Sequence, residues 1–187
     1  MSGQICGIDE AGRGCLAGPL CVAGCVLQRE IAGLADSKKL SEKRREELYA
    51  VITKNSRYKI VEISSAQVDE IGLSACLRSA LEQIIAYFMG FSGQIIYDGN
   101  ATFGVRGLQT LVKADAQIAE VSAASILAKV TRDRTMHELA QRYPQYGFAQ
   151  NKGYGSRAHI AAIERYGLTP FHRASYKIKS LQPSLFD

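Results

Sequence analysis

Apolar runs that end in a carboxylate restrict the fold of this sequence more than any other feature. The run ICGI leads into Asp9 and Glu10, QIIY leads into Asp98, and LQTLVKA leads into Asp115. Apolar runs of this length, rich in β-branched residues, are typical of buried strands. We therefore expect four carboxylates at strand ends of one sheet, where a divalent-metal site would suit a protein that acts on a phosphate backbone.

The remaining hydrophobic periodicity completes an α/β pattern. Residues 4–8 and 19–27 are separated by a glycine-rich turn and predict an antiparallel hairpin with Asp9 and Glu10 at its connecting end. Three strands in succession, followed by helix–strand units, predict a mixed five-stranded sheet flanked by helices, with a C-terminal helical appendage. The other expected strands are 58–64, 94–98 and 108–114, and the expected helices start at Ser41, span 73–88, extend from Asp115 to Pro144, and run from Ser156 to Gly167.

Length and charge favour one domain with a polyanionic partner. The chain has 187 residues, which is enough for one domain with a buried core and short for two. We expect this domain to span residues 1–180 and a flexible tail to follow over residues 181–187. The 23 Lys and Arg outnumber the 18 Asp and Glu, and the formal charge of +5 suits either a nucleic-acid partner or a plain basic protein.

Cysteine usage indicates a reducing compartment. The five cysteines include no Cys-x-x-Cys pair, and no histidine lies at zinc-ligand spacing, so we expect buried free thiols. No stretch approaches the roughly 18 apolar residues of a membrane span, and no signal pattern opens the sequence. The expectation is a soluble, cytoplasmic monomer without membrane contact.

The four strand-end acids have the chemistry of a magnesium or manganese site. Mg²⁺ prefers oxygen ligands and commonly takes one or two carboxylates per ion together with substrate phosphate. Four acids could hold two ions, one lowering the pKa of an attacking water and the other stabilising the leaving oxygen. A single aspartate after a strand also starts turns or caps helices, and Asp115, at an expected helix start, has this alternative.

Three further motifs could contact a nucleic acid, and the first two also have a structural alternative. The glycines of Gly12–Gly14 could let the backbone approach a sugar or phosphate, or could form a tight turn. Lys38 and Lys39 precede a helix start, where they could hold a phosphate or lie on a solvated surface. Tyr154 lies between two glycines, where its ring could pack on a nucleotide sugar or base.

Taken in order, these pieces resemble the ribonuclease HII family along nearly the whole chain. The resemblance implies the ribonuclease H-like fold and an endonuclease that cleaves the RNA strand of RNA–DNA hybrids. It also implies nicking of duplex DNA on the 5′ side of an embedded ribonucleotide, leaving 3′-hydroxyl and 5′-phosphate ends. The type 3 relatives carry an additional N-terminal domain, and the start of this chain at the first strand favours type 2. The matching segments are GIDEAGRG with GPL, DSKKLS, YDGN, KADA, VSAASILAKVTRD, KGYGSRAH and FHRASY.

The resemblance assigns roles to particular residues. Gly12, Arg13 and Gly14 match the motif that senses the ribose 2′-hydroxyl and neighbouring phosphates. Tyr154 matches the tyrosine that stacks on the following deoxyribose and helps to select the RNA-to-DNA junction. The matches to the metal-binding catalytic acids are Asp9, Glu10, Asp98 and Asp115.

Other polar residues of the matching motifs receive lesser roles. We expect Asp133 in a solvent-facing salt bridge, with an outer-shell role at the metal site as the alternative. His137, His159 and His172 are expected to pack or to face phosphate rather than to bind metal.

The C-terminal tail carries a separate hypothesis. Gln182–Phe186 resembles the short peptide by which bacterial replication proteins bind the sliding clamp, with Leu185 and Phe186 as apolar anchors. The alternative is a tail that folds back on the domain through the same two side chains.

Two other functions are open at this point. One is a non-catalytic nucleic-acid-binding module in which the acids serve as caps. The other is a DNA nuclease or resolvase of the wider superfamily that lacks ribose selection. A duplex with one ribonucleotide separates the three, because only the ribonuclease nicks it and spares an all-DNA control.

Overall fold

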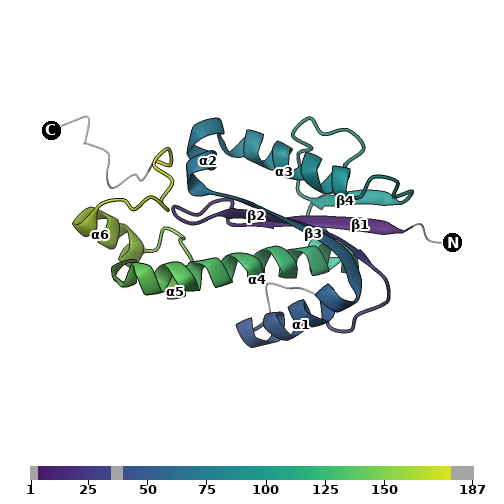
Figure 1. Cartoon of the computed structure of the whole chain (residues 1–187), viewed down its shortest axis with the longest axis horizontal. Helices are drawn as coiled ribbons and strands as arrows, with labels where there is room; N and C mark the ends of the chain where they lie inside the picture. Colours follow the sequence, from purple (N-terminus) through teal and green to yellow (C-terminus); the bar gives the residue numbers. More distant parts are fainter. Residues whose placement is uncertain (1–3, 35–39, 178–187) are drawn as a thin grey trace.

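The computed structural model describes residues 4–34 and 40–177 and has a five-stranded mixed sheet at its centre (Figure 1). The sheet order is β3-β2-β1-β4-β5, in which β2 is antiparallel to both β1 and β3. The pairs β1–β4 and β4–β5 are parallel. The predicted mixed sheet is therefore confirmed, and its strands are β1 (Ile5–Ala11), β2 (Leu20–Leu27), β3 (Ser56–Ile63), β4 (Gln94–Asp98) and β5 (Gln109–Leu111).

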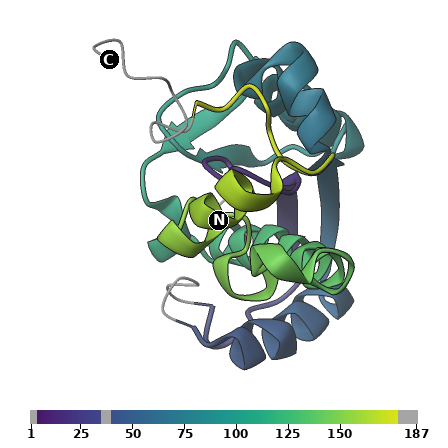
Figure 2. The ribbon, with the colours of Figure 1, turned by 90° about the vertical axis from the view of Figure 1, so that its left-hand side faces the viewer.

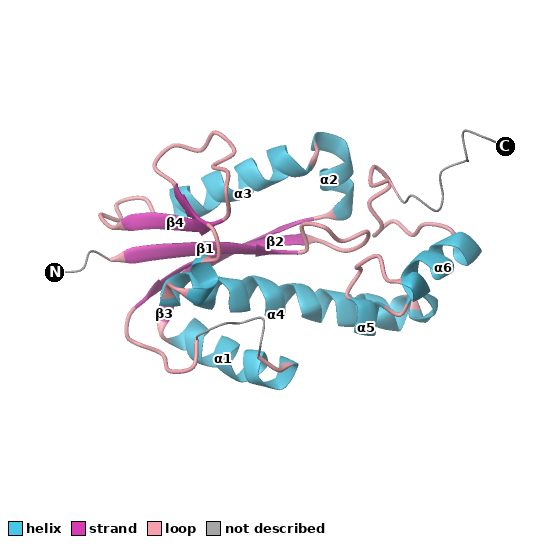
Figure 3. Cartoon of the chain, turned by 180° about the vertical axis from the view of Figure 1, so that it is seen from behind, coloured by secondary structure: helices cyan, strands magenta, loops and turns pink. Residues whose placement is uncertain are grey.

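Helices cover both faces of the sheet. Figures 1 and 2 show α2 and α3 on one face and α1 and α4 on the other. The short helices α5 and α6 continue beyond the end of α4, as the view from behind in Figure 3 also shows. The helices are α1 (Glu42–Lys54), α2 (Ser65–Ile71), α3 (Leu73–Tyr87), α4 (Ala119–Arg142), α5 (Phe148–Asn151) and α6 (Arg157–Tyr166).

Strand alternation divides the core into two layers. In β1, Cys6 and Ile8 are fully buried against α3, whereas the intervening residues point to the α4 face. On that second face Ala23 of β2 packs with α1 and α4. Gly7 lets α4 approach closely, because a Cβ at this position would lie 2.2 Å from the backbone nitrogen of Val121. The N-terminal part of α4 thus rests directly on the strand that carries Asp9.

Several element boundaries differ from the expectation. β1 extends to Ala11, so Asp9 and Glu10 lie within the strand and not beyond its end. α4 begins at Ala119 instead of Asp115, which lies in a separate short 3-10 helix. The left-handed conformation of Lys113, with φ of 58°, ends the extended segment after β5 and explains why the fifth strand is shorter than predicted.

Local sequence signals account for the helix ends. The side chain of Ser41 accepts a hydrogen bond from the backbone nitrogen of Arg44 and caps α1, and Ser156 caps α6 in the same way. Both predicted starts are confirmed. Helix α2 was not predicted, although Ser64 and Gln67 form the reciprocal capping box of its first turn.

The thiols behave as expected. Cys6, Cys15, Cys21, Cys25 and Cys76 are all free and buried. Among residues 4–34 and 40–177, no helix combines the length and apolar character needed to cross a bilayer.

Candidate active site

Three aspartates from distant parts of the sequence meet at one end of the sheet. Asp9 lies in β1, Asp98 ends the neighbouring parallel strand β4, and Asp115 lies in the 3-10 helix Ala114–Ala116. Their carboxylate oxygens can be chosen so that all lie within 4.8 Å of one another. The parallel pairing of β1 and β4 produces this convergence, because it brings the same ends of both strands together.

Backbone hydrogen bonds orient Asp98 within this cluster. Its Oδ1 accepts a hydrogen bond from the backbone nitrogen of Lys113 at 2.9 Å, and its Oδ2 accepts one from that of Asp115 at 3.4 Å. The sharp turn at Lys113 therefore ties the segment after β5 to the end of β4. Asp115 enters the cluster because of this turn and does not cap α4, whose N-cap residue is Ile118.

Burial and mutual repulsion disfavour the charged forms of these carboxylates when no cation is bound. Burial, followed by the neighbouring Glu10 carboxylate, raises the pKa of Asp9 well above its usual range. Burial and the charge of Asp115 raise the pKa of Asp98. Three oxygen donors at this separation, with charges that oppose one another, fit a hard divalent cation.

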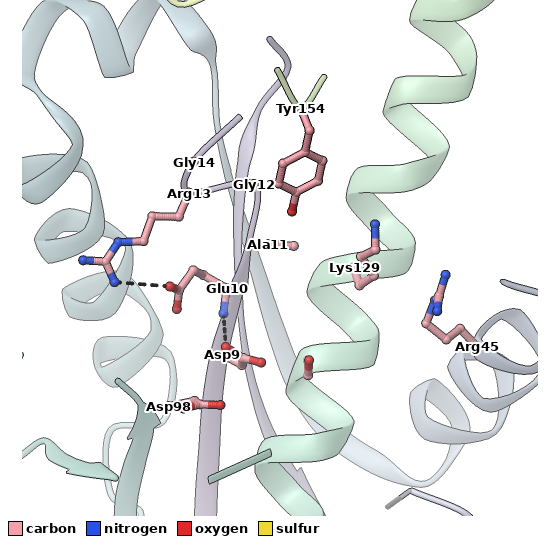
Figure 4. A pocket seen from close by; sticks show the side chains of 11 residues that line it. Asp9, Glu10, Ala11, Gly12, Arg13, Gly14, Arg45, Asp98, Lys129 and Tyr154 are labelled. Carbon is pink, nitrogen blue, oxygen red and sulfur yellow. Dashed lines mark hydrogen bonds and ion pairs between the residues drawn. The ribbon is translucent and has the colours of Figure 1, made fainter. Parts of the chain in front are cut away.

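Glu10 lies beside the cluster instead of within it. Consecutive residues of a strand point to opposite faces, so Glu10 turns toward the α3 side while Asp9 turns toward α4. Figure 4 shows its carboxylate directed at Arg13, and the closest nitrogen-to-oxygen distance is 3.6 Å. Burial raises the pKa of Glu10. The structure thus brings three of the four predicted acids together and places the fourth on the same pocket, next to a cation.

Asp9, Glu10 and Asp98 line a pocket whose other walls are basic and aromatic. The glycine segment Gly12–Gly14 forms one rim, and the half-exposed ring of Tyr154 stands above it (Figure 4). On the opposite side, α4 contributes Lys129 and α1 contributes Arg45. The pocket therefore combines a carboxylate cluster with groups suited to a polyanion and a planar ring.

Two buried arginines hold the glycine segment and the tyrosine loop together. Arg132 of α4 donates hydrogen bonds to the backbone oxygens of Ala17, Pro19 and Lys152, at 2.8–2.9 Å. Arg173 donates to the backbone oxygens of Arg13 and Gly18. Each guanidinium thus fixes loop backbone around the pocket, which aligns the two rims.

Comparison with known proteins identifies the family. The sequence model of a family described as Ribonuclease HII matches residues 6–179. The chain is 58% identical over 185 residues to ribonuclease HII of Campylobacter concisus, covering 98% of this chain and 99% of that protein. It is 60% identical over 179 residues to ribonuclease HII of Campylobacter hominis, covering 96% and 97% of the two chains.

The chain belongs to the ribonuclease HII family. It is therefore a metal-dependent ribonuclease H, a hydrolase that acts on a nucleic acid.

Solved ribonucleases H share the fold. The structure of the PCNA:RNase HII complex from Archaeoglobus fulgidus superimposes with a TM-score of 0.79 and 28% identity, over 97% of this chain and 98% of that one. A Bst-RNase HIII structure determined in complex with Mn²⁺ gives a TM-score of 0.74 at 20% identity, covering 94% of this chain and 67% of that one.

The remaining predicted residues have different outcomes. Lys38 and Lys39 lie outside the described residues. Asp133 does form salt bridges, but its carboxylate is buried, with a side-chain exposure of 5%, so the solvent-facing prediction was wrong. Lys129, one turn earlier on α4, and Arg45 of α1 contact it. His159 and His172 pack against each other, 3.1 Å apart between Nε2 atoms.

Three residues that line the pocket on the side of α4 and α1 were not predicted. Ser125 donates a hydrogen bond to Asp9, and Lys129 and Arg45 line the pocket. Ser125 and Lys129 are four residues apart, the spacing of one helix face, and this period is the signal that could have placed them together. No sequence pattern indicates that Arg45 lies at the pocket, because its position there depends on the packing of α1 against α4.

Proposed function

We propose that this chain hydrolyses the RNA strand of RNA–DNA hybrids and nicks duplex DNA on the 5′ side of an embedded ribonucleotide, leaving 3′-hydroxyl and 5′-phosphate ends. The observation that carries this proposal is the convergence of Asp9, Asp98 and Asp115, two of which, Asp9 and Asp98, line a pocket together with Gly12–Gly14 and Tyr154. We assign the binding of the metal ions to the acids and the selection of ribose to the rim formed by Gly12–Gly14. Removal of ribonucleotides during DNA replication and repair would follow from this activity.

The proposed metal ligands are Asp9, Asp98 and Asp115, with Glu10 as the fourth acid. Two Mg²⁺ or Mn²⁺ ions, when bound with substrate, would lower the pKa of the attacking water and stabilise the leaving oxygen. The protein itself contributes the orientation of the carboxylates, through the Ser125 side chain at Asp9 and the backbone nitrogens at Asp98. Arg13 holds the Glu10 carboxylate at the edge of the same pocket.

Ribose recognition is assigned to the glycine rim. Gly12 adopts a φ of 92°, which favours glycine, and it lines the pocket together with Gly14, where a Cβ would meet no atom within 4 Å. Backbone groups at such close range can hydrogen-bond a 2′-hydroxyl, and a deoxyribose would leave them unpaired. Arg13 adds a cation for neighbouring phosphates.

Tyr154 is assigned to the nucleotide that follows the ribonucleotide. Tyr154 is 47% exposed at the mouth of the pocket, while the backbone beside it is fixed by Arg132 and by hydrogen bonds from Leu16 and Ala17 to Gly153. An exposed ring on a fixed loop is suited to stacking on a sugar. The 2′-hydroxyl of a second ribonucleotide would crowd that contact.

A substrate panel tests the proposal against its two rivals. We expect nicking of a duplex with one ribonucleotide and of an RNA–DNA hybrid, in the presence of Mg²⁺ or Mn²⁺, with an all-DNA duplex left whole. Ligation of the nicked strand by a ligase that requires 3′-hydroxyl and 5′-phosphate ends would check the end chemistry. A binding module would leave every duplex whole, and a DNA nuclease would cut the control.

Two further assignments concern segments outside the described residues. We propose that Lys38 and Lys39 contact substrate phosphates and that Gln182–Phe186 binds a bacterial sliding clamp. The clamp assignment is supported by the archaeal relative solved in complex with PCNA. Deleting residues 182–187 should abolish clamp binding in a pull-down and leave nicking of a free oligonucleotide intact; equal capture of the truncated protein would refute it.

The proposed setting is a monomer in the cytoplasm. All five cysteines are free and buried as thiols, which suits a reducing compartment. Size-exclusion chromatography with light scattering tests the monomer.

A further inference from the structure

One buried carboxylate joins two cations from different helices. Asp133 of α4 accepts a hydrogen bond from the Nζ of Lys129, one turn earlier on α4, at 2.6 Å. Its other oxygen lies 4.0 Å from an Nη of Arg45 on α1. The Asp133 side chain is 5% exposed, so solvent screens this arrangement weakly. Lys129 and Arg45 are therefore held near each other, although their like charges repel.

The charge of this trio is not balanced. Elsewhere along α1, Glu46 pairs with Arg134 of α4, and Glu42 pairs with Lys152, which follows α5. Each of these cations has one carboxylate. Asp133, by contrast, is shared between two cations, so the trio carries one excess positive charge. Such an excess, partly shielded from water, favours an anionic ligand.

Arg45 also has unused hydrogen-bonding capacity. One Nη donates to the backbone oxygen of Leu40, and the 4.0 Å distance to Asp133 exceeds a hydrogen bond. Its Nε is buried and has no hydrogen-bond partner among residues 4–34 and 40–177. A guanidinium offers five N–H groups in a planar fork, which suits the oxygens of a phosphate.

The two cations face the pocket that contains the acids. Figure 4 shows Lys129 and Arg45 on the wall opposite Arg13. Ser125, which bonds Asp9, lies four residues before Lys129 on α4, so the rise along the helix is about 6 Å. Within the described part of the chain, no ion pair links these cations to the acid cluster. They lie one helical turn from it.

We propose that Lys129 and Arg45 form a subsite for a backbone phosphate next to, but distinct from, the scissile one, and that Asp133 is a positioning residue that holds them. The proposal rests on the proposed nuclease function, because it takes a nucleic-acid duplex as the ligand. The phosphate belongs to either the cut strand or its complement. Both present the same phosphodiester chemistry to the subsite.

Neutral-linkage scanning locates that phosphate. The Asp9→Asn protein, which should not cut, is titrated with fluorescent duplexes that contain one ribonucleotide and one methylphosphonate, moved along each strand in turn. We expect a single position at which loss of the phosphate charge weakens binding about tenfold. When Lys129→Met is added to the Asp9→Asn protein, the methylphosphonate at this position should no longer change the affinity. The strand that carries this position identifies the source of the phosphate.

Salt dependence provides a second readout. Lys129→Met should reduce the slope of log affinity against log salt by about one, because one phosphate contact is lost. Arg134→Met is the matched control, since Arg134 lies on α4, is paired with Glu46 and does not line the pocket. Its scan should match that of the parent. Arg45→Lys keeps the charge without the planar fork and should reduce the penalty at the same position only in part.

Substitution of Asp133 distinguishes a positioning role from a simple effect of its charge on affinity. Asp133→Asn removes a negative charge, so overall affinity should be kept or raised, yet the methylphosphonate penalty should spread over several positions. A penalty that keeps its full size at one position in Lys129→Met, Arg45→Lys and Asp133→Asn, with folding verified by circular dichroism, would overturn the subsite. Failure of the nuclease proposal has a different signature, because the Asp9→Asn parent would then lack any preference for the ribonucleotide duplex over all-DNA.

Discussion

His159 and His172 are buried and face each other with their Nε2 atoms 3.1 Å apart. The Nδ1 of His172 accepts a hydrogen bond from the backbone nitrogen of Thr169, so neutral His172 carries its proton on Nε2 and donates to His159. His159 then donates from Nδ1 to the backbone oxygen of Tyr154, at 2.8 Å. A chain of neutral hydrogen bonds thus ends on the loop that presents Tyr154 to the pocket.

This pair should make the fold sensitive to acid. Burial lowers the pKa of His172 to about 4, with a further contribution from His159, and burial lowers that of His159. Because the unfolded state binds the proton more readily, this stability is present above about pH 6.5 and is lost as the pH falls toward 4. The loss should approach about 3 kcal/mol.

Urea unfolding at several pH values measures this effect. The buried aspartates have raised pKa values and shift stability in the opposite sense, so wild type must be compared with His172→Gln. The difference in free energy of unfolding between the two proteins should shrink from pH 7 to pH 5. A difference that stays constant over this interval would show that the pair does not titrate with folding.

Asp9→Asn should stabilise the protein in chelator. The folded-state pKa of Asp9 is raised, so its charge opposes folding at neutral pH, and the amide removes that charge. We expect a higher Tm than wild type in chelator at pH 7, and a smaller gain in Tm on addition of Mn²⁺. Equal gains in the two proteins would mean that Asp9 does not contribute to cation binding.

The two glycines of the pocket rim should separate folding from substrate contact. A Cβ on Gly12 would lie 2.1 Å from the Nε of Arg132, and its φ of 92° is strained for alanine, so Gly12→Ala should cost about 3 kcal/mol. A Cβ on Gly14 meets no atom within 4 Å. Gly14→Ala should leave urea unfolding unchanged and weaken nicking, and a comparable loss of stability in both variants would contradict this division.

Tyr154→Ala should reduce selection of the RNA-to-DNA junction. The ring is half-exposed and contributes little to the core, so the Tm should stay close to that of wild type. Loss of a stacking contact predicts about a tenfold fall in kcat/KM for the single-ribonucleotide duplex. Cleavage of a continuous RNA–DNA hybrid provides the comparison, and an equal fall on both substrates would argue against a junction role.

Sequence patterns predicted what depends on local periodicity and motif order. The five strands, the capped starts of α1 and α6, and the family follow from patterns of apolar residues and from segments such as YDGN and KADA. The proximity of Asp98 to Asp9 was also foreseeable, because each follows an apolar strand.

Features that depend on side-chain direction or helix packing could not be read in this way. Glu10 lies outside the cluster of three aspartates because consecutive side chains of a strand point to opposite faces of the sheet. Asp133 looked solvent-facing because its burial depends on α1, which comes from a distant part of the sequence. Arg132 lies in the middle of α4 and binds three backbone oxygens, and no motif signals partners of that kind.

We propose that Asp9, Asp98 and Asp115 bind the divalent cation on which cleavage depends. Single-turnover nicking of a one-ribonucleotide duplex, with wild type and each aspartate-to-asparagine variant over a range of Mn²⁺ concentrations, tests it most directly. We predict no nicking in chelator and a loss of at least about a thousandfold in every variant. Cleavage that persists in chelator, or near-wild-type nicking by any one variant, would contradict the claim.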